Sequence, residues 1–298
     1  MSASTPSDDT ITAATITTED RVLDGPHGEL PVRIYRPTER AAAGLVWLHG
    51  GGFWAGDLDM AEGDWVARAF ASRGIVVVSV DYRLAPALEP DQASRGDVHY
   101  PTASQEAAFA FGWAVTSGPA SGAWAFGGAS AGGNLATGAT LRLIAEGGPI
   151  PALAVLAYPT LLAVQPAPDA TLRAALDADP VADHFGPDAV RRMYENYLGG
   201  PAEDADTMAA PGIATPAELR DFPPTIMINS EVDELRVSGE AFAATLRAAG
   251  VDIDVSTEPG TVHGHLNRPE EAAATASIER FAARIAALSP LTSEGTTA

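Results

Sequence analysis

The sequence predicts an α/β protein in which a mostly parallel central sheet is covered by helices on both faces. Short, continuous apolar runs alternate with helix-compatible stretches along most of the chain, and the β-branched run at residues 75–80 is the clearest of them. Continuous apolar runs are typical of strands that are buried on both faces, as they are in parallel sheets. Strands that alternate with helices favour this layered arrangement.

The expected elements follow in chain order. Residues 1–18 are rich in Ser, Thr, Ala and Asp, which predicts a loose N-terminal tail. Residues 22–35 are predicted to form a hairpin, because two apolar segments flank the turn signal Gly25-Pro26-His27-Gly28. Further strands are expected at residues 44–48, 75–80, 123–126, 152–158, 225–229 and 251–257. Helices are expected at residues 64–72, 103–115, 131–145, 240–249 and 270–288.

One long segment interrupts this alternation. Residues 161–212 are rich in Pro, Asp and Ala, with an amphipathic piece at residues 189–198. In a sheet whose functional groups follow the strand ends, such an insertion is a candidate cap or lid. We therefore expect a single domain over residues 19–290 that contains a cap at 161–212 and is followed by a C-terminal tail at 291–298.

Charge and hydropathy exclude several classes of function. Asp and Glu number 39 against 18 Lys and Arg, so the formal net charge is −21. A surface of this sign repels nucleic-acid phosphates and anionic lipids, so we expect neither nucleic acid nor membrane as a partner. The N-terminus lacks the basic and apolar regions of a signal peptide. The apolar stretch at residues 152–164 contains Pro159 and is too short to cross a bilayer, so a cytoplasmic location is expected.

Two absences narrow the chemistry. The chain has no Cys, and all 18 of the residues counted as Lys or Arg are Arg. The lack of Cys excludes a thiol nucleophile, a zinc ribbon and an iron–sulfur cluster. The lack of Lys excludes Schiff-base chemistry and a P-loop lysine. An enzyme of this composition is expected to use Ser, Thr, Asp, Glu or a bound water as its nucleophile.

A candidate nucleophile lies between an expected strand and an expected helix. The segment Gly128-Ala129-Ser130-Ala131-Gly132 fits the pattern G-x-S-x-G, which in this setting holds the Ser in a sharp turn with its hydroxyl exposed above the sheet. A plain glycine-rich turn or a phosphate-binding loop is the alternative. A phosphate loop would need a Lys or a G-x-G-x-x-G pattern after a strand, and neither is present. The pattern therefore favours Ser130 as a nucleophile.

A glycine triplet follows the strand expected at residues 44–48. In His49-Gly50-Gly51-Gly52-Phe53, consecutive glycines allow backbone N–H groups to point at one spot, as an oxyanion requires. We expect the amides of Gly51, Gly52 and Ala131 to form an oxyanion hole. A flexible loop is the alternative, and His49 is expected to brace the loop rather than to carry a proton.

Three ordered motifs carry a family resemblance. The glycine loop, the segment Asp81-Tyr82-Arg83-Leu84-Ala85-Pro86 and the run Gly128-Ala129-Ser130-Ala131-Gly132-Gly133 resemble those of the bacterial hormone-sensitive-lipase-like carboxylesterases, over roughly residues 22–288. The resemblance implies the α/β-hydrolase fold, hydrolysis of esters, and no metal or organic cofactor. Ala129 stands where that family usually has Asp, which implies a changed hydrogen-bond network beside the nucleophile.

The hydrolase order Ser, then Asp or Glu, then His indicates where the acid lies. Asp233 follows the first strand expected after the cap, in a segment that resembles the family's Asp-Pro-Leu-Arg with Glu234 in place of Pro. Glu231 and Glu234 are its rivals, and the match to Leu-Arg favours Asp233.

The base is expected in the loop after the last strand. His263-Gly264 lies there and resembles the family's His-Gly pair, so His263 is the expected base. His265 replaces an aromatic residue that is usual in the family, and whether it lines the pocket or faces solvent stays open. Other candidate pocket residues are Phe53, Trp54 and Tyr82, for which core packing is an equal alternative.

The resemblance implies a serine carboxylesterase that acts on small esters with short acyl chains. An amidase, an aryl formamidase, a lactonase or an acyltransferase would use the same machinery. A ligand receptor is the alternative from another class. Plant hormone receptors that resemble this family lack the triad His, whereas His263 is present here. A small-molecule ester is the expected partner, and a homodimer stays open.

Overall fold

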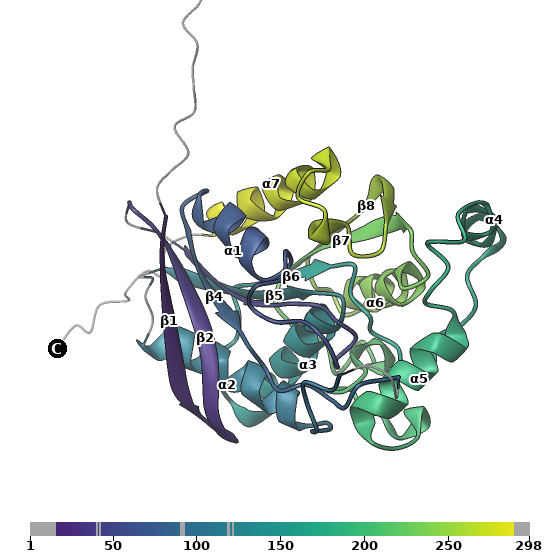
Figure 1. The fold of residues 1–298 in the computed structure, drawn as a ribbon, viewed down its shortest axis with the longest axis horizontal. Helices are drawn as coiled ribbons and strands as arrows, with labels where there is room; N and C mark the ends of the chain where they lie inside the picture. Colours follow the sequence, from purple (N-terminus) through teal and green to yellow (C-terminus); the bar gives the residue numbers. More distant parts are fainter. Residues whose placement is uncertain are drawn as a thin grey trace, which may run out of the picture.

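One sheet runs through the part of the chain that the computed structural model describes, which is residues 16–39, 41, 43–89, 93–117, 120 and 122–288. Within these residues it has eight strands in the order β1-β2-β4-β3-β5-β6-β7-β8 (Figure 1). Strands β3 to β8 run parallel, while β2 pairs antiparallel with both β1 and β4. The strands are β1 (Ile16–Gly25), β2 (Gly28–Pro37), β3 (Ala43–Leu48), β4 (Ile75–Val80), β5 (Ala123–Ala129), β6 (Leu153–Ala157), β7 (Thr225–Val232) and β8 (Ile253–Val262).

Helices connect the parallel strands and cover both faces of the sheet, as the sequence predicts (Figure 1). They are α1 (Asp64–Ala71), α2 (Thr102–Ser117), α3 (Ala131–Glu146), α4 (Ala170–Ala178), α5 (Pro187–Leu198), α6 (Arg236–Ala248) and α7 (Ala272–Ala286), with short 3₁₀ turns η1 (Ala202–Asp204), η2 (Pro211–Ile213) and η3 (His265–Asn267).

Strand β3 shows how side-chain alternation builds the two layers. Leu45 and Trp47 point to the face that α1 and α7 cover, and Trp47 packs against Phe70 of α1. Val46 and Leu48 point to the opposite face, which α2 and α3 cover. Successive residues of a strand face opposite sides, so a strand that is apolar throughout requires helices on both.

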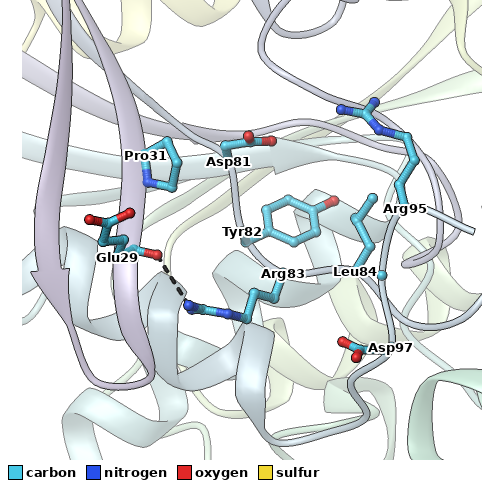
Figure 2. A pocket seen from close by; sticks show the side chains of 9 residues that line it. Glu29, Pro31, Asp81, Tyr82, Arg83, Leu84, Arg95 and Asp97 are labelled. Atoms are coloured by element: carbon cyan, nitrogen blue, oxygen red, sulfur yellow. Dashed lines mark hydrogen bonds between the residues drawn. The ribbon is translucent and has the colours of Figure 1, made fainter.

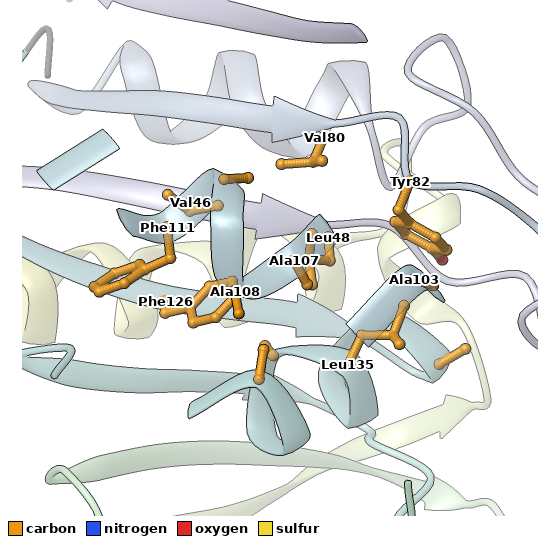
Figure 3. Packing of buried hydrophobic residues seen from close by; sticks show 14 of the residues in the cluster. Val46, Leu48, Val80, Tyr82, Ala103, Ala107, Ala108, Phe111, Phe126 and Leu135 are labelled. Carbon is orange, nitrogen blue, oxygen red and sulfur yellow. The ribbon is translucent and has the colours of Figure 1, made fainter. Parts of the chain in front are cut away.

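The layer formed by α2 and α3 packs tightly against the sheet (Figure 3). Phe111 of α2 stacks on Phe126 of β5, with ring centroids 4.9 Å apart. Leu135 of α3 is fully buried in the same cluster. This packing fixes α3, and therefore the turn that enters it, relative to β5.

Several expected boundaries need correction, and one helix has no expected counterpart. Residues 16–18 are not part of a tail, because they pair with residues 35–37 as the start of β1; residues 1–15 and the tail expected at 291–298 lie outside the described residues. Helix α6 begins at Arg236 rather than at residue 240. Helix α4 was not expected, since it buries only Leu172 and Leu176.

The segment expected as a cap, residues 161–212, carries α4 and α5. Helix α5 buries Val190, Met193, Tyr194 and Tyr197, so the amphipathic piece packs on the core. Tyr197 stacks on Phe53, with ring centroids 4.0 Å apart. The cap segment therefore rests directly on the residue that follows the glycine triplet.

In the described part of the chain, none of the helices combines the length and the apolar character that crossing a bilayer requires.

Candidate active site

Loops that follow four parallel strands bring the candidate residues together. The glycine triplet follows β3, Ser130 follows β5, Asp233 follows β7 and His263 follows β8. Because the carboxyl ends of parallel strands lie at one edge of a sheet, residues far apart in the chain meet there.

Ser130 occupies the sharp turn between β5 and α3. Its backbone has φ 52° and ψ −117°, a conformation that non-glycine residues rarely adopt. A Cβ on Gly132 would lie 2.2 Å from the carbonyl oxygen of Leu48, and a Cβ on Gly128 would lie 2.6 Å from the same atom. Glycine is required at both positions because β3 passes so close to the turn.

His263 bridges Ser130 and Asp233. Its Nδ1 lies 2.7 Å from Asp233 Oδ2, and its Nε2 lies 2.9 Å from Ser130 Oγ. In the tautomer that satisfies both contacts, Nδ1–H donates to Asp233 and the Ser130 hydroxyl donates to Nε2. Asp233 is fully buried, and its other oxygen accepts a hydrogen bond from the amide of Leu235 at 2.9 Å.

The rival carboxylates are occupied elsewhere. Glu231 accepts a hydrogen bond from the amide of Gly260 at 2.7 Å. Glu234 accepts one from the amide of Phe185 at 3.0 Å. Of the three candidate acids, Asp233 is the one in hydrogen-bond contact with His263.

Charge and burial act against each other at His263. Burial lowers the pKa of its imidazole, but the carboxylate of Asp233 and then that of Glu62 raise it, so the pKa lies above the usual value of 6.5. The positively charged imidazolium form of His263 therefore persists to a higher pH than that of a free imidazole.

The glycine triplet presents backbone amides to the pocket that holds Ser130. Gly51 and Gly52 have φ of 115° and 60°, which glycine adopts without strain. Within the described residues, the amides of Gly51, Gly52 and Ala131 have no hydrogen-bond acceptor. Ala131 is the first residue of α3, where backbone N–H groups have no partner inside the helix.

His49 supports the glycine loop through hydrogen bonds and ring stacking, as the sequence predicts. It is fully buried, its Nδ1–H donates to the carbonyl of Gly50 at 2.7 Å, and its ring stacks on Tyr82 at 4.5 Å. The Tyr82 hydroxyl donates to the carbonyl of His49 at 2.7 Å. Burial lowers the pKa of His49 to about 4, so the ring is neutral near pH 7.

A pocket of about 240 Å³ opens beside Ser130 and His263. Its wall includes Gly51 and Gly52, and Trp54 is the one expected wall residue that lines it. Its remaining members are Ala55, Met60, Glu62, Phe185, Gly264 and Asn267.

Three expected pocket residues lie elsewhere. Phe53 is 2% exposed and packs in the core under Tyr197. Tyr82 is held under the glycine loop by its bond to His49. His265 neither lines the pocket nor faces solvent, because Gly264 (φ 73°) and the turn η3 direct it into the core.

His265 is held by two buried hydroxyls. Its Nδ1 lies 2.9 Å from Ser230 Oγ, and its Nε2 lies 3.0 Å from Ser277 Oγ. The Ser277 hydroxyl donates in turn to Glu258 at 2.6 Å. Burial lowers the pKa of His265 to about 3, so this ring is a neutral structural group.

A second pocket, of about 310 Å³, has Tyr82 in its wall (Figure 2). Asp81 and Asp97 face it together with Arg83 and Arg95. The guanidinium of Arg83 donates to the carbonyl of Glu29 at 3.1 Å (Figure 2). Neither Ser130 nor His263 lines this pocket, so it is separate from the site above.

Sequence reasoning missed Glu62, Asn267 and Phe185, which also line the pocket of Ser130. Glu62 lies in the acidic segment 57–64, and its partner Asn267 is 205 residues away along the chain. No local pattern distinguishes these residues from ordinary loop residues.

Comparison with known proteins identifies the family to which the chain belongs. The model of a family described as having the alpha/beta hydrolase fold matches residues 45–267. The chain is 35% identical to esterase LipI of Mycobacterium tuberculosis, over 83% of this chain and 74% of that protein. It is 32% identical to an ethyl acetate hydrolase of Pseudomonas putida, over 78% of this chain and 70% of that protein.

Solved structures show the same architecture. An esterase of Pyrobaculum calidifontis superimposes with a TM-score of 0.78 at 30% identity, covering 91% of this chain and 84% of that one. The protein described here is a member of the alpha/beta hydrolase family. Its relatives place it among the hormone-sensitive-lipase-like esterases, as its motifs predict.

Proposed function

We propose that this protein is a carboxylesterase, a serine hydrolase that cleaves small carboxylic esters through an acyl-enzyme intermediate. The observation that carries the proposal is the hydrogen-bonded series from the Ser130 hydroxyl through His263 to Asp233. A nucleophile, a base and a group that orients the base are the parts that this chemistry needs.

The proposed reaction begins with Ser130. His263 Nε2 accepts the hydroxyl proton as Oγ attacks the ester carbonyl, and the negative charge develops on the carbonyl oxygen. Amides of Gly51, Gly52 and Ala131 then donate to this oxyanion. Asp233 keeps Nδ1 protonated and stabilises the imidazolium.

The second half of the reaction releases both products. His263 gives its proton to the leaving alcohol, which breaks the ester C–O bond and leaves an acyl group on Ser130. A water molecule then gives a proton to His263 Nε2 and attacks the acyl carbonyl. The acid is released as the Ser130 hydroxyl recovers its proton.

Short acyl chains are the proposed substrates. The pocket volume of about 240 Å³ lies below the range of about 300–1,000 Å³ that is typical of sites for drug-sized ligands. The rings of Phe185 and Trp54 form part of its wall. We propose that residues 161–212 act as the cap that carries Phe185 over the site.

Ester cleavage is favoured over the other candidates. Relatives that match most of the chain are named as esterases and ester hydrolases, which supports esters over amides and lactones. The contact between His263 and Ser130 supports an enzyme over a receptor. A cytoplasmic location and a homodimer belong to the same proposal, and cell fractionation and light scattering test them.

Turnover of p-nitrophenyl acetate by Ser130→Ala tests the proposal. We expect turnover to fall to the buffer background while the variant keeps the fold of the wild type. Turnover that survives the substitution would assign the nucleophile to another group. A panel of esters, anilides and lactones on the wild type then ranks the substrate classes.

A further inference from the structure

Glu62 is a buried carboxylate in the wall of the Ser130 pocket that the proposed reaction does not use. The residue is 2% exposed, and its side chain lines the pocket together with Ser130 and His263. An isolated buried carboxylate is costly, so one that persists is held by hydrogen bonds.

Three donors from three different loops hold this carboxylate. The amide of Gly50 donates to Oε2 at 2.8 Å. The Tyr158 hydroxyl and the side-chain amide of Asn267 each donate to Oε1 at 2.7 Å. Gly50 precedes the oxyanion amides, and Asn267 closes the turn after His263, so Glu62 joins the two loops that must face each other across Ser130.

The carboxylate lies close to the nucleophile. A Cβ placed on Gly50 would lie 2.4 Å from Glu62 Oε2 and 3.2 Å from Ser130 Cβ. Both groups therefore border the same point of the glycine loop. Among the residues that line the pocket, Glu62 is the one that carries a carboxylate.

The electrostatic surroundings leave the charge of Glu62 without a permanent counter-ion. No Arg of the described chain forms an ion pair with it. Burial raises the pKa of Glu62 above its usual value, and the Tyr158 hydroxyl, the positive form of His263 and the amides of Gly50 and Asn267 oppose this rise without cancelling it. Tyr82, Tyr158, His263 and, beyond His263, Asp233 are the titratable groups that face this region.

We propose that Glu62 is a positioning residue for the hydrolysis: its carboxylate fixes the glycine loop against the His263 loop and stabilises the positive charge that His263 acquires. This inference rests on the proposed function. The attraction between the Glu62 carboxylate and His263 exists only while His263 is protonated, as it is in the transition states. It therefore lowers the free-energy barrier of the reaction rather than the free energy of substrate binding.

Glu62→Gln removes the negative charge. It also replaces one accepting oxygen with an NH₂ group, which cannot accept a hydrogen bond from the donor that faces it. We expect kcat for p-nitrophenyl acetate to fall about tenfold, with KM changed by less than about twofold. Because a negative charge that raises the pKa of His263 is lost, the acid limb of kcat/KM is expected to move about 0.5–1 unit to lower pH.

Glu106→Gln is the matched control. Glu106 is another fully buried carboxylate, which accepts from the amide of Arg83 at 2.8 Å, differs from Glu62 in being ion-paired with the Arg83 guanidinium, and does not line the Ser130 pocket. The acid limb of the kcat/KM profile of Glu106→Gln is expected to coincide with that of the wild type. An unmoved acid limb in Glu62→Gln, or an equal shift in the control, would overturn the proposal, since a structural role alone lowers kcat without moving the limb.

Asn267→Ala provides a second test that does not depend on the folding of Glu62→Gln. Asn267 is exposed, and its loss removes one donor to Glu62 without a change of charge. We expect kcat to fall about threefold; an unchanged kcat would contradict the positioning role. Labelling of Ser130 by a phosphonate in these variants separates the two proposals, because labelled Ser130 in a variant with wild-type kinetics would refute only the role of Glu62.

Discussion

The ring centroids of Phe185 and His263 lie 4.4 Å apart, although the two residues come from the cap segment and from the loop after β8. The amide of Phe185 donates to the side chain of Glu234, the neighbour of Asp233. Gln165, also in the cap segment, donates to the carbonyl of Glu234 at 3.0 Å. The cap segment, the acid loop and the base are therefore joined at one side of the pocket.

Phe185→Ala is expected to enlarge the pocket and to change acyl-chain preference. Removing the ring opens apolar space beside His263, and each buried methylene of a longer acyl chain gains free energy there. We predict that kcat/KM for p-nitrophenyl hexanoate relative to the acetate rises about tenfold. Phe109→Ala, in a half-buried residue outside this pocket, is the control and is expected to keep the wild-type ratio. An unchanged ratio in Phe185→Ala would mean that this ring does not limit the chain.

Asp233→Asn is expected to lower kcat by about 10³-fold or more, with little effect on KM. An amide at this position favours the wrong tautomer of His263, whose Nδ1 must carry the proton. Kinetics with p-nitrophenyl acetate measure the effect. Glu231→Gln removes the charge of a rival acid and is expected to retain most activity. A larger loss of kcat in Glu231→Gln than in Asp233→Asn would identify Glu231 as the acid.

The pH profile of kcat/KM reports the protonation of His263. The neutral imidazole is the base, and the pKa of this group is raised in the folded protein by Asp233 and Glu62. Activity is therefore expected to be full above this pKa and to fall as the pH decreases through it, with the midpoint above 6.5. Initial rates at low substrate concentration from pH 5 to 9 test this. A midpoint below 6.5, or a flat profile, would contradict it.

His265→Phe is expected to destabilise the fold by about 1–3 kcal/mol, because the Ser230 hydroxyl loses its buried partner. Urea unfolding followed by circular dichroism measures the free energy of unfolding. His184→Phe replaces an exposed residue of the cap segment and is expected to stay within about 0.5 kcal/mol of the wild type. Equal stability of the two variants would show that the buried hydrogen bonds of His265 contribute nothing.

Continuous patterns made most of the fold predictable. The apolar runs at β3, β4 and β6 are buried throughout, so sequence and structure agree within a residue or two at their ends. The motifs around Ser130, Asp233 and His263 follow strand ends, and parallel strands bring such ends together. The sequence underestimates the length of edge strand β1, which begins at Ile16 rather than at residue 22, because most of its residues are exposed and form no apolar pattern.

Contacts between distant loops were not predictable in the same way. Glu62 gains its place only through Gly50, Tyr158 and Asn267, which no local pattern connects to it. The direction of His265 depends on the left-handed backbone of Gly264 and on the turn after it. The sequence also assigns His263 its ordinary pKa of about 6.5. The burial of its ring and the nearby carboxylate of Glu62, which both change this pKa, become visible only in three dimensions.

Covalent labelling tests the central claim most directly. The protein is treated with a p-nitrophenyl phosphonate ester, digested and analysed by mass spectrometry, with Ser130→Ala treated in parallel. We predict one phosphonate adduct per chain, on Ser130, loss of turnover in step with labelling, and no adduct in the variant. An adduct on a different hydroxyl, or full turnover after Ser130 is labelled, would contradict the assignment of Ser130 as the nucleophile.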